Sequence, residues 1–383
     1  MSELFSDGGA VREAGAAILY GAGQVGRDVC RVLTEEGIRV LCMLDRRARE
    51  GERHLGVPLY TPDACPVEPA RRSAVPVVLS IFNRDVDIPD LALAMRALGF
   101  TRIVSFVDLH AHFPNELGDR FWLTRRGYVE SHQKDIAAAE ALWADDESRA
   151  QYRGFIALRR SGVFDSRLNP RPEDTHYLPS DVPSWLKSRP LRFIDCGAYE
   201  GDTLEQMIEA SLQIEASAHF EPDLRNFAGL ARRVRGLRKD LKGPAMLWPC
   251  AVSDRSGTVS FCSGLDEASG VSDDGPINVT AVALDDVLAG WRPTFIKMDI
   301  EGSELEALSG ARQIIAESLP SLAISVYHRP DHLWRIPLML ASWSELGGYR
   351  FYLRSHGFNG FDTVLYASPE QSSGSHTSTE VRS

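Results

Sequence analysis

Strand-length runs of apolar residues alternate along most of this chain with segments whose apolar residues recur every three or four positions. Ala16–Tyr20 and Ile38–Leu44 are such runs near the beginning, and Phe193–Asp195 and Phe295–Met298 are such runs in the second half. This alternation is typical of α/β folds, in which helices connect the strands of a mostly parallel sheet. The pattern therefore predicts two Rossmann-like α/β units in tandem.

The same pattern predicts the domain organisation. We expect a small Rossmann-like domain over 1–113, a helical connector or lid over 114–190, a larger α/β domain over 191–367 and a disordered tail over 368–383. Within the connector, residues 134–160 have helical periodicity. The tail is rich in Ser, Thr and Glu, a composition typical of disorder.

A glycine-rich turn follows the strand that ends at Asp195. Gly197 and Gly201 lie in this turn, and Asp202 with Glu205 matches a helix cap ahead of an apolar stripe. In an open α/β sheet such a turn lies at the carboxyl edge of the strands, where ligands bind. It carries three acidic residues and lacks the lysine of a phosphate loop, so it would repel phosphate. It predicts a neutral or cationic ligand such as an adenosyl sulfonium, unless the glycines only let helix and strand pack.

Further acidic residues end later strands. Glu221 lies about twenty residues beyond the turn, where an acidic residue hydrogen-bonds a ribose diol. Asp299 and Glu301 end another strand, ahead of a helix that we expect to begin with a Ser303–Glu306 capping box. These positions predict one ligand site shared by several strand ends.

The segments that carry these features occur in a fixed order: FIDCGAYEGDT, HFEPDLRNF, CAVSDRSGTVSF, VALDDVL and FIKMDIEGSELEALSGA. In this order they resemble the FkbM family of S-adenosylmethionine-dependent methyltransferases, over roughly residues 190–367, and IKMDIEGSELEALSGA is the most specific stretch. The resemblance implies a class I methyltransferase domain of α/β fold, with a seven-stranded, mostly parallel sheet. It also implies S-adenosylmethionine as methyl donor and, usually, O-methylation of a sugar or a hydroxylated natural product.

The resemblance also implies donor-binding positions. Those expected around the methionine part are Asp195, Gly197, Tyr199, Gly201, Asp202 and Thr203. Glu221 is expected on the ribose, and Ala251 and Val252 near the adenine. Tyr177 lies in a Tyr-hydrophobic-Pro stretch that we expect to form a lid over donor or substrate, where an aromatic ring would attract a sulfonium. The alternative is a solvated connector in which Tyr177 packs on a helix.

Methyl transfer requires alignment of the acceptor oxygen with the activated methyl group and removal of a proton. Asp299, Glu301 and His328 are the candidates for these roles. His328 is the first candidate for the general base, because an unperturbed imidazole has a pKa of about 6.5. Asp299 would orient the acceptor or act as the base, and Lys297 would pair with a carboxylate. Alternatively Asp299, Glu301 and His328, with or without His332, hold a divalent metal ion such as Mg²⁺ or Mn²⁺. In the simplest alternative, Glu301 only favours a helix N-terminus and His328 is only buried.

A second glycine motif, Gly21-Ala22-Gly23-Gln24-Val25-Gly26, lies near the N-terminus, and Asp45 ends the next strand nineteen residues later. Strand, GxGxxG, helix, strand and acid form the dinucleotide fingerprint. The segment also resembles the small Rossmann-like N-terminal domain of bacterial sugar acyltransferases. Such a domain would hold a nucleotide or nucleotide-sugar, bind NAD for redox chemistry, or serve only structure or dimerisation. No Tyr-x-x-x-Lys pattern accompanies it to support hydride transfer.

Composition restricts the partners. The formal net charge of -11 argues against a general nucleic-acid binder, which needs a basic surface. Six cysteines without a CxxC pair predict buried thiols in a reducing cytosol. With no signal peptide and no apolar run of about eighteen residues, we expect a cytoplasmic protein that binds no membrane. A small-molecule acceptor is the expected partner, with a possible homodimer through the N-terminal domain. The competing functions are an NAD-dependent sugar-modifying oxidoreductase and a non-catalytic binding protein.

Overall fold

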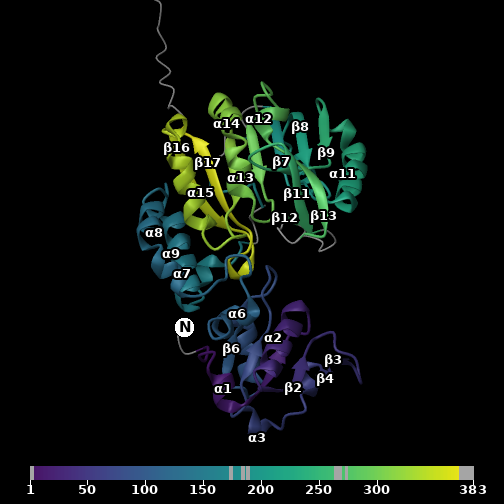
Figure 1. Ribbon diagram of the computed structural model, residues 1–383, viewed down its shortest axis with the longest axis vertical. Helices are drawn as coiled ribbons and strands as arrows, with labels where there is room; N and C mark the ends of the chain where they lie inside the picture. Colours follow the sequence, from purple (N-terminus) through teal and green to yellow (C-terminus); the bar gives the residue numbers. More distant parts are fainter. Residues whose placement is uncertain are drawn as a thin grey trace, which may run out of the picture.

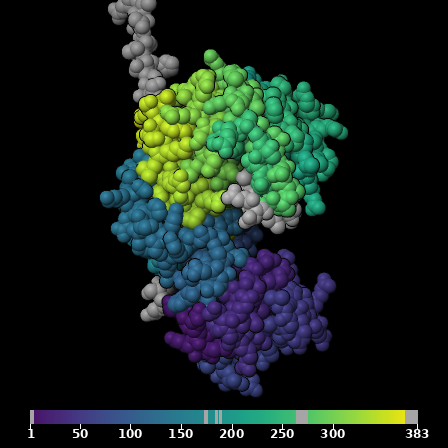
Figure 2. Space-filling model, in the orientation of Figure 1, coloured from purple at the N-terminus to yellow at the C-terminus, as the bar shows by residue number. Residues whose placement is uncertain are grey.

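The computed structural model describes residues 4–171, 176–182, 186, 190–262, 270–271 and 275–370. Two α/β units lie at opposite ends of an elongated molecule, and a layer of helices lies between them (Figure 1). The space-filling view shows the helical layer in contact with both units (Figure 2). Among the described residues, no helix is both long and apolar enough to cross a membrane.

A six-stranded sheet organises the N-terminal unit in the order β3-β4-β2-β1-β5-β6. All neighbouring strands are parallel except β3, which is antiparallel to β4. Without the short β3, this order matches strands 3-2-1-4-5 of the dinucleotide-binding fold, whose full order is 3-2-1-4-5-6. The elements are α1 (Ala10–Ala14), β1 (Ala16–Tyr20), α2 (Gln24–Glu35), β2 (Arg39–Leu44), β3 (Arg53–His54), β4 (Val57–Tyr60), α3 (Pro69–Arg72), β5 (Val77–Leu79), α4 (Ile88–Ala97), β6 (Ile103–Ser105) and α5 (Phe106–His110).

The connector consists of short helices that cover an edge of the second sheet. They are α6 (Pro114–Leu117), α7 (Gly127–Ser131), α8 (Gln133–Glu140) and α9 (Asp146–Ser161). The helical pattern predicted over 134–160 is split, because the Asp145 carboxylate accepts a hydrogen bond from the backbone N–H of Ser148 and so starts a new helix. The Ser148 hydroxyl in turn accepts from the backbone N–H of Leu353 in the edge strand β16 (Tyr349–Ser355). The connector thus protects a strand edge that would otherwise be open to pairing.

A seven-stranded sheet organises the C-terminal unit in the order β16-β17-β15-β14-β7-β8-β9. Only β17 runs antiparallel to its neighbours. This confirms the predicted α/β fold with a mostly parallel sheet. Its elements are β7 (Leu191–Cys196), α10 (Asp202–Glu209), β8 (Ile214–Phe220), α11 (Leu224–Gly236), β9 (Ala245–Trp248), α12 (Leu284–Val287), β14 (Phe295–Met298), α13 (Glu304–Ser309), α14 (Arg312–Ser318), β15 (Ser321–Ser325), α15 (His332–Ala341), β16 and β17 (Thr363–Pro369).

A smaller sheet packs beside the large one, in the order β10-β13-β11-β12. Its strands are β10 (Ala251–Val252), β11 (Gly257–Cys262), β12 (Gly270–Val271) and β13 (Ile277–Val282). Ser368 and Pro369, which the sequence assigned to the disordered tail, instead pair with Arg350 and Tyr349 in β16. The rest of the predicted tail, 371–383, lies outside the described residues.

Candidate active site

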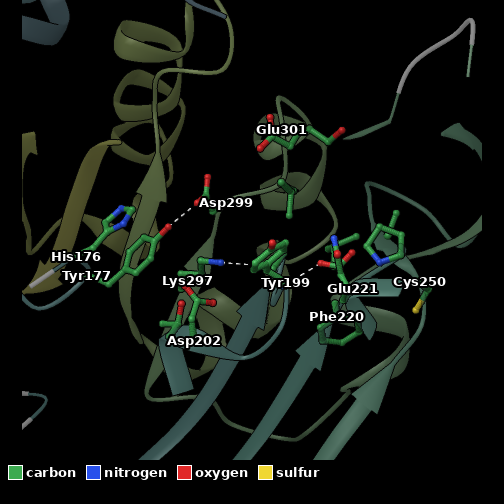
Figure 3. A pocket seen from close by; sticks show the side chains of 18 of the residues that line it. His176, Tyr177, Tyr199, Asp202, Phe220, Glu221, Cys250, Lys297, Asp299 and Glu301 are labelled. Atoms are coloured by element: carbon green, nitrogen blue, oxygen red, sulfur yellow. Dashed lines mark hydrogen bonds between the residues drawn. The ribbon is translucent and has the colours of Figure 1, made fainter. Parts of the chain in front are cut away.

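A cavity of about 190 Å³ lies where β7, β8 and β14 end (Figure 3). The residues in its wall that the sequence singled out are Gly197, Tyr199, Asp202 and Thr203 after β7, Glu221 after β8, Ala251 and Val252 in β10, and Lys297, Asp299 and Glu301 in or after β14. The wall also includes residues from segments outside the sheet. Tyr177 belongs to the segment before β7, and Arg84 extends from the loop after β5 in the N-terminal unit. The cavity therefore lies at the edge of the sheet that faces the N-terminal unit.

The turn after β7 owes its shape to a close backbone approach and to one carboxylate. Gly197 has a φ of +77°, and a Cβ there would lie 1.9 Å from the carbonyl oxygen of Asp299, so the position requires glycine. The Glu221 carboxylate accepts hydrogen bonds from the backbone N–H groups of Tyr199, at 2.9 Å, and Asp223, at 2.8 Å. Burial raises the pKa of Glu221 to about 7. Glu221 and the glycine turn thus form one continuous wall, as the sequence predicts.

Lys297 lies in the same wall and joins it to a buried acid. Its ammonium donates to the carbonyl oxygen of Gly197, at 2.5 Å, and lies 3.2 Å from Oδ1 of Asp195, which confirms the predicted carboxylate pairing. Burial opposes the charge on Lys297, but Asp195 and Asp299 outweigh it and raise the lysine pKa. Asp195 has no exposed surface and also lies 3.3 Å from Nδ1 of His219. Asp195 therefore lies one layer below the cavity and holds Lys297, which lines it.

Tyr177 and Asp299 meet at the cavity wall (Figure 3). The Tyr177 hydroxyl donates to Oδ2 of Asp299 at 2.6 Å, while Oδ1 is buried and lies 3.3 Å from Nε2 of His328. Burial disfavours the ionised form of Asp299, but the charges of His328 and Lys297 outweigh it and lower its pKa. Asp299 is thus an ionised carboxylate with a fixed orientation.

His328 lies behind Asp299 rather than in the cavity wall. Its Nδ1 lies 2.7 Å from Oε1 of Glu304, and its Nε2 lies 3.3 Å from Asp299 and 3.7 Å from Glu301. Burial lowers the pKa of His328, but Glu304, Glu301 and Asp299 outweigh it and raise the pKa to about 10. An imidazole that carries both protons at neutral pH has no lone pair for another. This geometry favours a buried cation over the general base that the sequence suggests.

Glu304 completes this group, although no pattern in the sequence marks it as a site residue. It is fully buried at the start of α13, where Oε1 accepts from the backbone N–H of Ile300 and Oε2 lies 3.1 Å from Nδ1 of His332. Burial raises the pKa of Glu304, but His328 and His332 outweigh it and hold the pKa well below its ordinary value. The predicted capping box is wrong, because the Ser303 side chain makes no capping hydrogen bond. The sequence pattern pointed to Ser303 and Glu306, whereas the residue that contacts His328 is Glu304, next to Ser303.

The structure does not gather the residues predicted to hold a metal ion, because Glu304 rather than Glu301 groups with Asp299 and His328. Asp299, Glu304 and His328 each offer an atom within 4.8 Å of the others. Glu304 approaches Nδ1 of the ring and Asp299 approaches Nε2, so the two carboxylates lie on opposite sides of one imidazole. A metal ion would also have to displace a proton from His328, whose pKa the neighbouring carboxylates raise. We therefore derive no catalytic step through a metal ion.

The comparisons with known proteins identify the domain that contains this cavity. The model of the Methyltransferase FkbM domain matches residues 195–359, which include the glycine turn, Glu221 and the Asp299–His328 group. Residues 195–359 belong to the FkbM methyltransferase family. The chain is accordingly an S-adenosylmethionine-dependent methyltransferase.

A solved structure shares the fold of nearly the whole chain. The crystal structure of Methyltransferase FkbM from Methylobacillus flagellatus KT matches with a TM-score of 0.75, over 96% of this chain and 95% of that chain, at 22% sequence identity. The shared fold therefore includes the N-terminal unit and the helical layer as well as the FkbM domain. The comparison with curated proteins gave no match.

Most of the residues predicted to bind the donor line the FkbM cavity, and two do not. Besides Asp195, Gly201 lies outside it. Gly201 has a φ of +87° and precedes α10, and a Cβ there would lie 3.0 Å from the Leu230 side chain in α11. The helix begins at Asp202 without the predicted side-chain cap, so Asp202 and Thr203 face the cavity.

The apolar end of the cavity contains aromatic residues that the sequence analysis missed. Ala251 and Val252 lie there as predicted, together with Phe220 at the end of β8 and Phe261 in β11. The residues around Phe261 in the sequence do not indicate that it lines a site, because only the strand pairing of the small sheet brings it to the cavity. The cavity of the FkbM domain thus has an apolar end near β10 and an acidic end near β14.

Proposed function

We propose that the FkbM domain methylates a hydroxyl oxygen of a sugar, a nucleotide-sugar or another hydroxylated natural product. The observation that carries this proposal is a pair of carboxylates, Asp299 and Glu301, in one cavity wall. The pKa of Asp299 is lowered, whereas burial raises the pKa of Glu301 to about 7. Two carboxylates whose pKa values are pushed apart are suited to different roles.

Glu301 is the better placed of the two to accept a proton. A general base works best when its pKa lies near the operating pH, as that of Glu301 does. Glu301 also has a φ of +55°, a sparsely populated backbone conformation of the kind that clusters at active sites. We assign proton removal to Glu301 and orientation of the acceptor to Asp299. The acceptor's O–H bond would break and its proton would pass to the Glu301 carboxylate. The acceptor oxygen would bond to the methyl carbon as the bond from that carbon to the donor's sulfur breaks, leaving a neutral thioether.

The other end of the cavity fits the donor. Glu221 has carboxylate oxygens beside the glycine turn that would accept from a ribose diol, and Phe220 and Val252 offer apolar contact to a nucleobase. When bound, S-adenosylmethionine supplies a methyl group activated by a sulfonium. The acidic wall formed by Asp202 and Asp299 would stabilise that positive charge.

Polar groups from both α/β units border the acceptor end. Arg84, from the N-terminal unit, lies 2.8 Å from the carboxylate of Asp362. His176 stacks on the ring of Tyr177 with the centroids 3.8 Å apart, and Tyr327 completes the wall. Several hydrogen-bonding groups around one opening suit an acceptor with several hydroxyls.

The test is a screen of acceptors with the full chain and S-adenosylmethionine. Monosaccharides, nucleotide-sugars and hydroxylated natural products are compared with amines and thiols, with S-adenosylhomocysteine release as the signal. The proposal predicts release only with hydroxylated acceptors, and an O-methyl resonance in the NMR spectrum of the product. Methylation of nitrogen, sulfur or carbon would contradict it. Reduction of NAD⁺ with the same acceptors would favour the oxidoreductase, and inactivity with every acceptor class would favour a binding protein.

A further inference from the structure

The N-terminal unit contains a second cavity that methyl transfer does not use. It has a volume of about 660 Å³ and lies at the carboxyl ends of β1, β2 and β5. The chain runs outward from β1 to β2 and β4, and then returns to β5 on the other side of β1. A crevice at such a reversal of strand order is where open α/β sheets bind ligands.

Gly21 and Gly23 of the GxGxxG motif line this cavity and Gly26 does not. The need for glycine differs among the three positions. Gly21 has a φ of +107°, and a Cβ on Gly26 would lie 2.0 Å from the carbonyl oxygen of Gly21, so the fold itself requires both. Gly23 has an ordinary φ of −69°, and a Cβ there would meet no atom within 4 Å. Neither backbone strain nor packing requires glycine at Gly23. A missing side chain at that point leaves room for a ligand to approach the backbone.

Two features beside Gly23 match the two ends of a nucleoside diphosphate. The helix α2 begins directly after Gly23, with no side-chain cap and no acidic residue in its first turn, so its N-terminus favours an anion. Asp45, after β2, is held in place because its oxygens accept from the backbone N–H groups of Ala22, at 3.0 Å, and Arg47, at 2.8 Å. Each carboxylate oxygen keeps a second lone pair for a ribose hydroxyl.

The charged residues of the cavity wall restrict what the diphosphate can carry. Asp85, Asp87 and Asp90 line the cavity in the loop after β5 and the start of α4, whereas Arg46 and Arg47 line it next to Asp45. Carboxylates accept hydrogen bonds from hydroxyl groups and repel a further anion. A neutral group with several hydroxyls therefore fits beyond the diphosphate, and an acidic group does not.

We propose that this cavity is a second binding site, for a nucleoside diphosphate joined to a neutral sugar. The loop 80–87 borders both cavities, because Asn83 and Asp85 line the N-terminal one and Arg84 lines that of the methyltransferase. The proposal rests on the N-terminal unit alone. Its failure would leave the methyl-transfer proposal intact, and the reverse also holds.

The test is calorimetry on the full chain saturated with S-adenosylhomocysteine, so that the methyl-donor site is occupied. UDP-glucose, ADP-glucose, GDP-mannose and dTDP-glucose are the probes, with UDP-glucuronate as an acidic counterpart and NAD⁺ as a competitor. We expect at least one neutral nucleotide-sugar to bind at one site per chain, and UDP-glucuronate to bind more weakly than UDP-glucose if UDP is the preferred nucleotide. Gly23→Val should weaken binding by about tenfold or more, because the extended backbone accepts valine and the side chain fills the ligand space.

Gly348→Val is the matched control, since a Cβ there also meets no atom within 4 Å and the residue borders neither cavity. It should bind like the unchanged protein. Asp45→Asn is the second variant, used if Gly23→Val fails to fold, and it should also bind more weakly. The proposal is overturned if none of the four neutral probes binds, if NAD⁺ binds more tightly than all of them, or if the folded variants retain full affinity.

Discussion

The hydroxyl of Tyr177 donates a 2.6 Å hydrogen bond to Oδ2 of Asp299, although 122 positions separate the two residues. The backbone N–H of Tyr177 also donates to the hydroxyl of Tyr366, at 3.1 Å. Tyr177 is therefore fixed both to β17 and to the end of β14. The residue expected in a lid instead orients a carboxylate of the cavity wall.

Tyr177→Phe removes this donor and keeps the ring that lies 5.3 Å from the Lys297 ammonium. A hydrogen bond to a charged group contributes about 1.5–3 kcal/mol, so we expect kcat to fall by about tenfold to a hundredfold, with little change in donor affinity. Tyr349→Phe is the control, because it removes a 2.7 Å hydrogen bond to the Pro320 carbonyl away from the cavity. Equal kcat values for the two variants would contradict the role of Tyr177.

Glu301 should control the pH dependence of methyl transfer. Its pKa of about 7 means that the ionised base becomes available as the pH rises, so kcat/KM should increase through about pH 7 and then level off. Glu301→Gln should remove this increase and lower kcat/KM by about 10²–10⁴. Asp299→Asn should lower kcat/KM but retain its increase through about pH 7.

Glu306→Gln provides the same substitution on the exposed face of α13 and should change neither rate nor profile. A Glu301→Gln variant that keeps the original pH profile would exclude Glu301 as the base.

His328 should make the stability of the protein pH-dependent. Its folded pKa of about 10 lies above the unfolded value of about 6.5. Its contribution is therefore complete below about pH 6.5 and is lost as the pH rises through about 10. Glu304→Gln removes the closest carboxylate, so this variant should be less stable at pH 7, with a flatter decline between pH 7 and 10.

Urea unfolding at several pH values measures both effects. His328→Gln should flatten the decline in the same way. Glu317→Gln, on the exposed face of α14, should follow the unchanged protein. Identical pH dependence in all the proteins would show that His328 is not held as a cation.

Arg354 should stabilise the contact between the helical layer and β16. It is 2% exposed, and its guanidinium lies 2.8 Å from Asp145 and 3.0 Å from Asp181. Arg354→Met leaves two carboxylates without their buried partner, so the free energy of unfolding should fall by about 3 kcal/mol. Arg350→Met, on the same strand, breaks only an exposed pair with Glu370 and should cost less than about 1 kcal/mol. Equal losses in thermal or urea unfolding would contradict this account of the contact.

The sequence predicted features that depend on local order along the chain. Gly197 and Glu221 each follow a strand, and parallel strands bring their carboxyl ends to one edge, so both were predictable. The register of β7 and β14, which pairs Asp195 with Lys297, was not predictable from local order. That pairing determines which acid lies beneath the cavity and which acid lines it.

Other residues depend on contacts between distant segments. Glu304 becomes a partner of His328 only because the turn before α13 packs against the end of β15, and Phe261 reaches the cavity only through the small sheet. The pKa of His328 follows from three carboxylates that surround it in space, whereas its neighbours in the sequence suggest an ordinary imidazole. The contacts of these residues and the pKa of His328 can therefore be assigned only from the three-dimensional structure.

Calorimetric titration of S-adenosylhomocysteine into the full chain, with and without Glu221→Gln, tests the central claim most directly. The account predicts one binding site per chain, unaffected by saturating NAD⁺, and an affinity about tenfold or more weaker in the variant. An unchanged protein that binds no S-adenosylhomocysteine, or a variant that binds it equally well, would contradict the account.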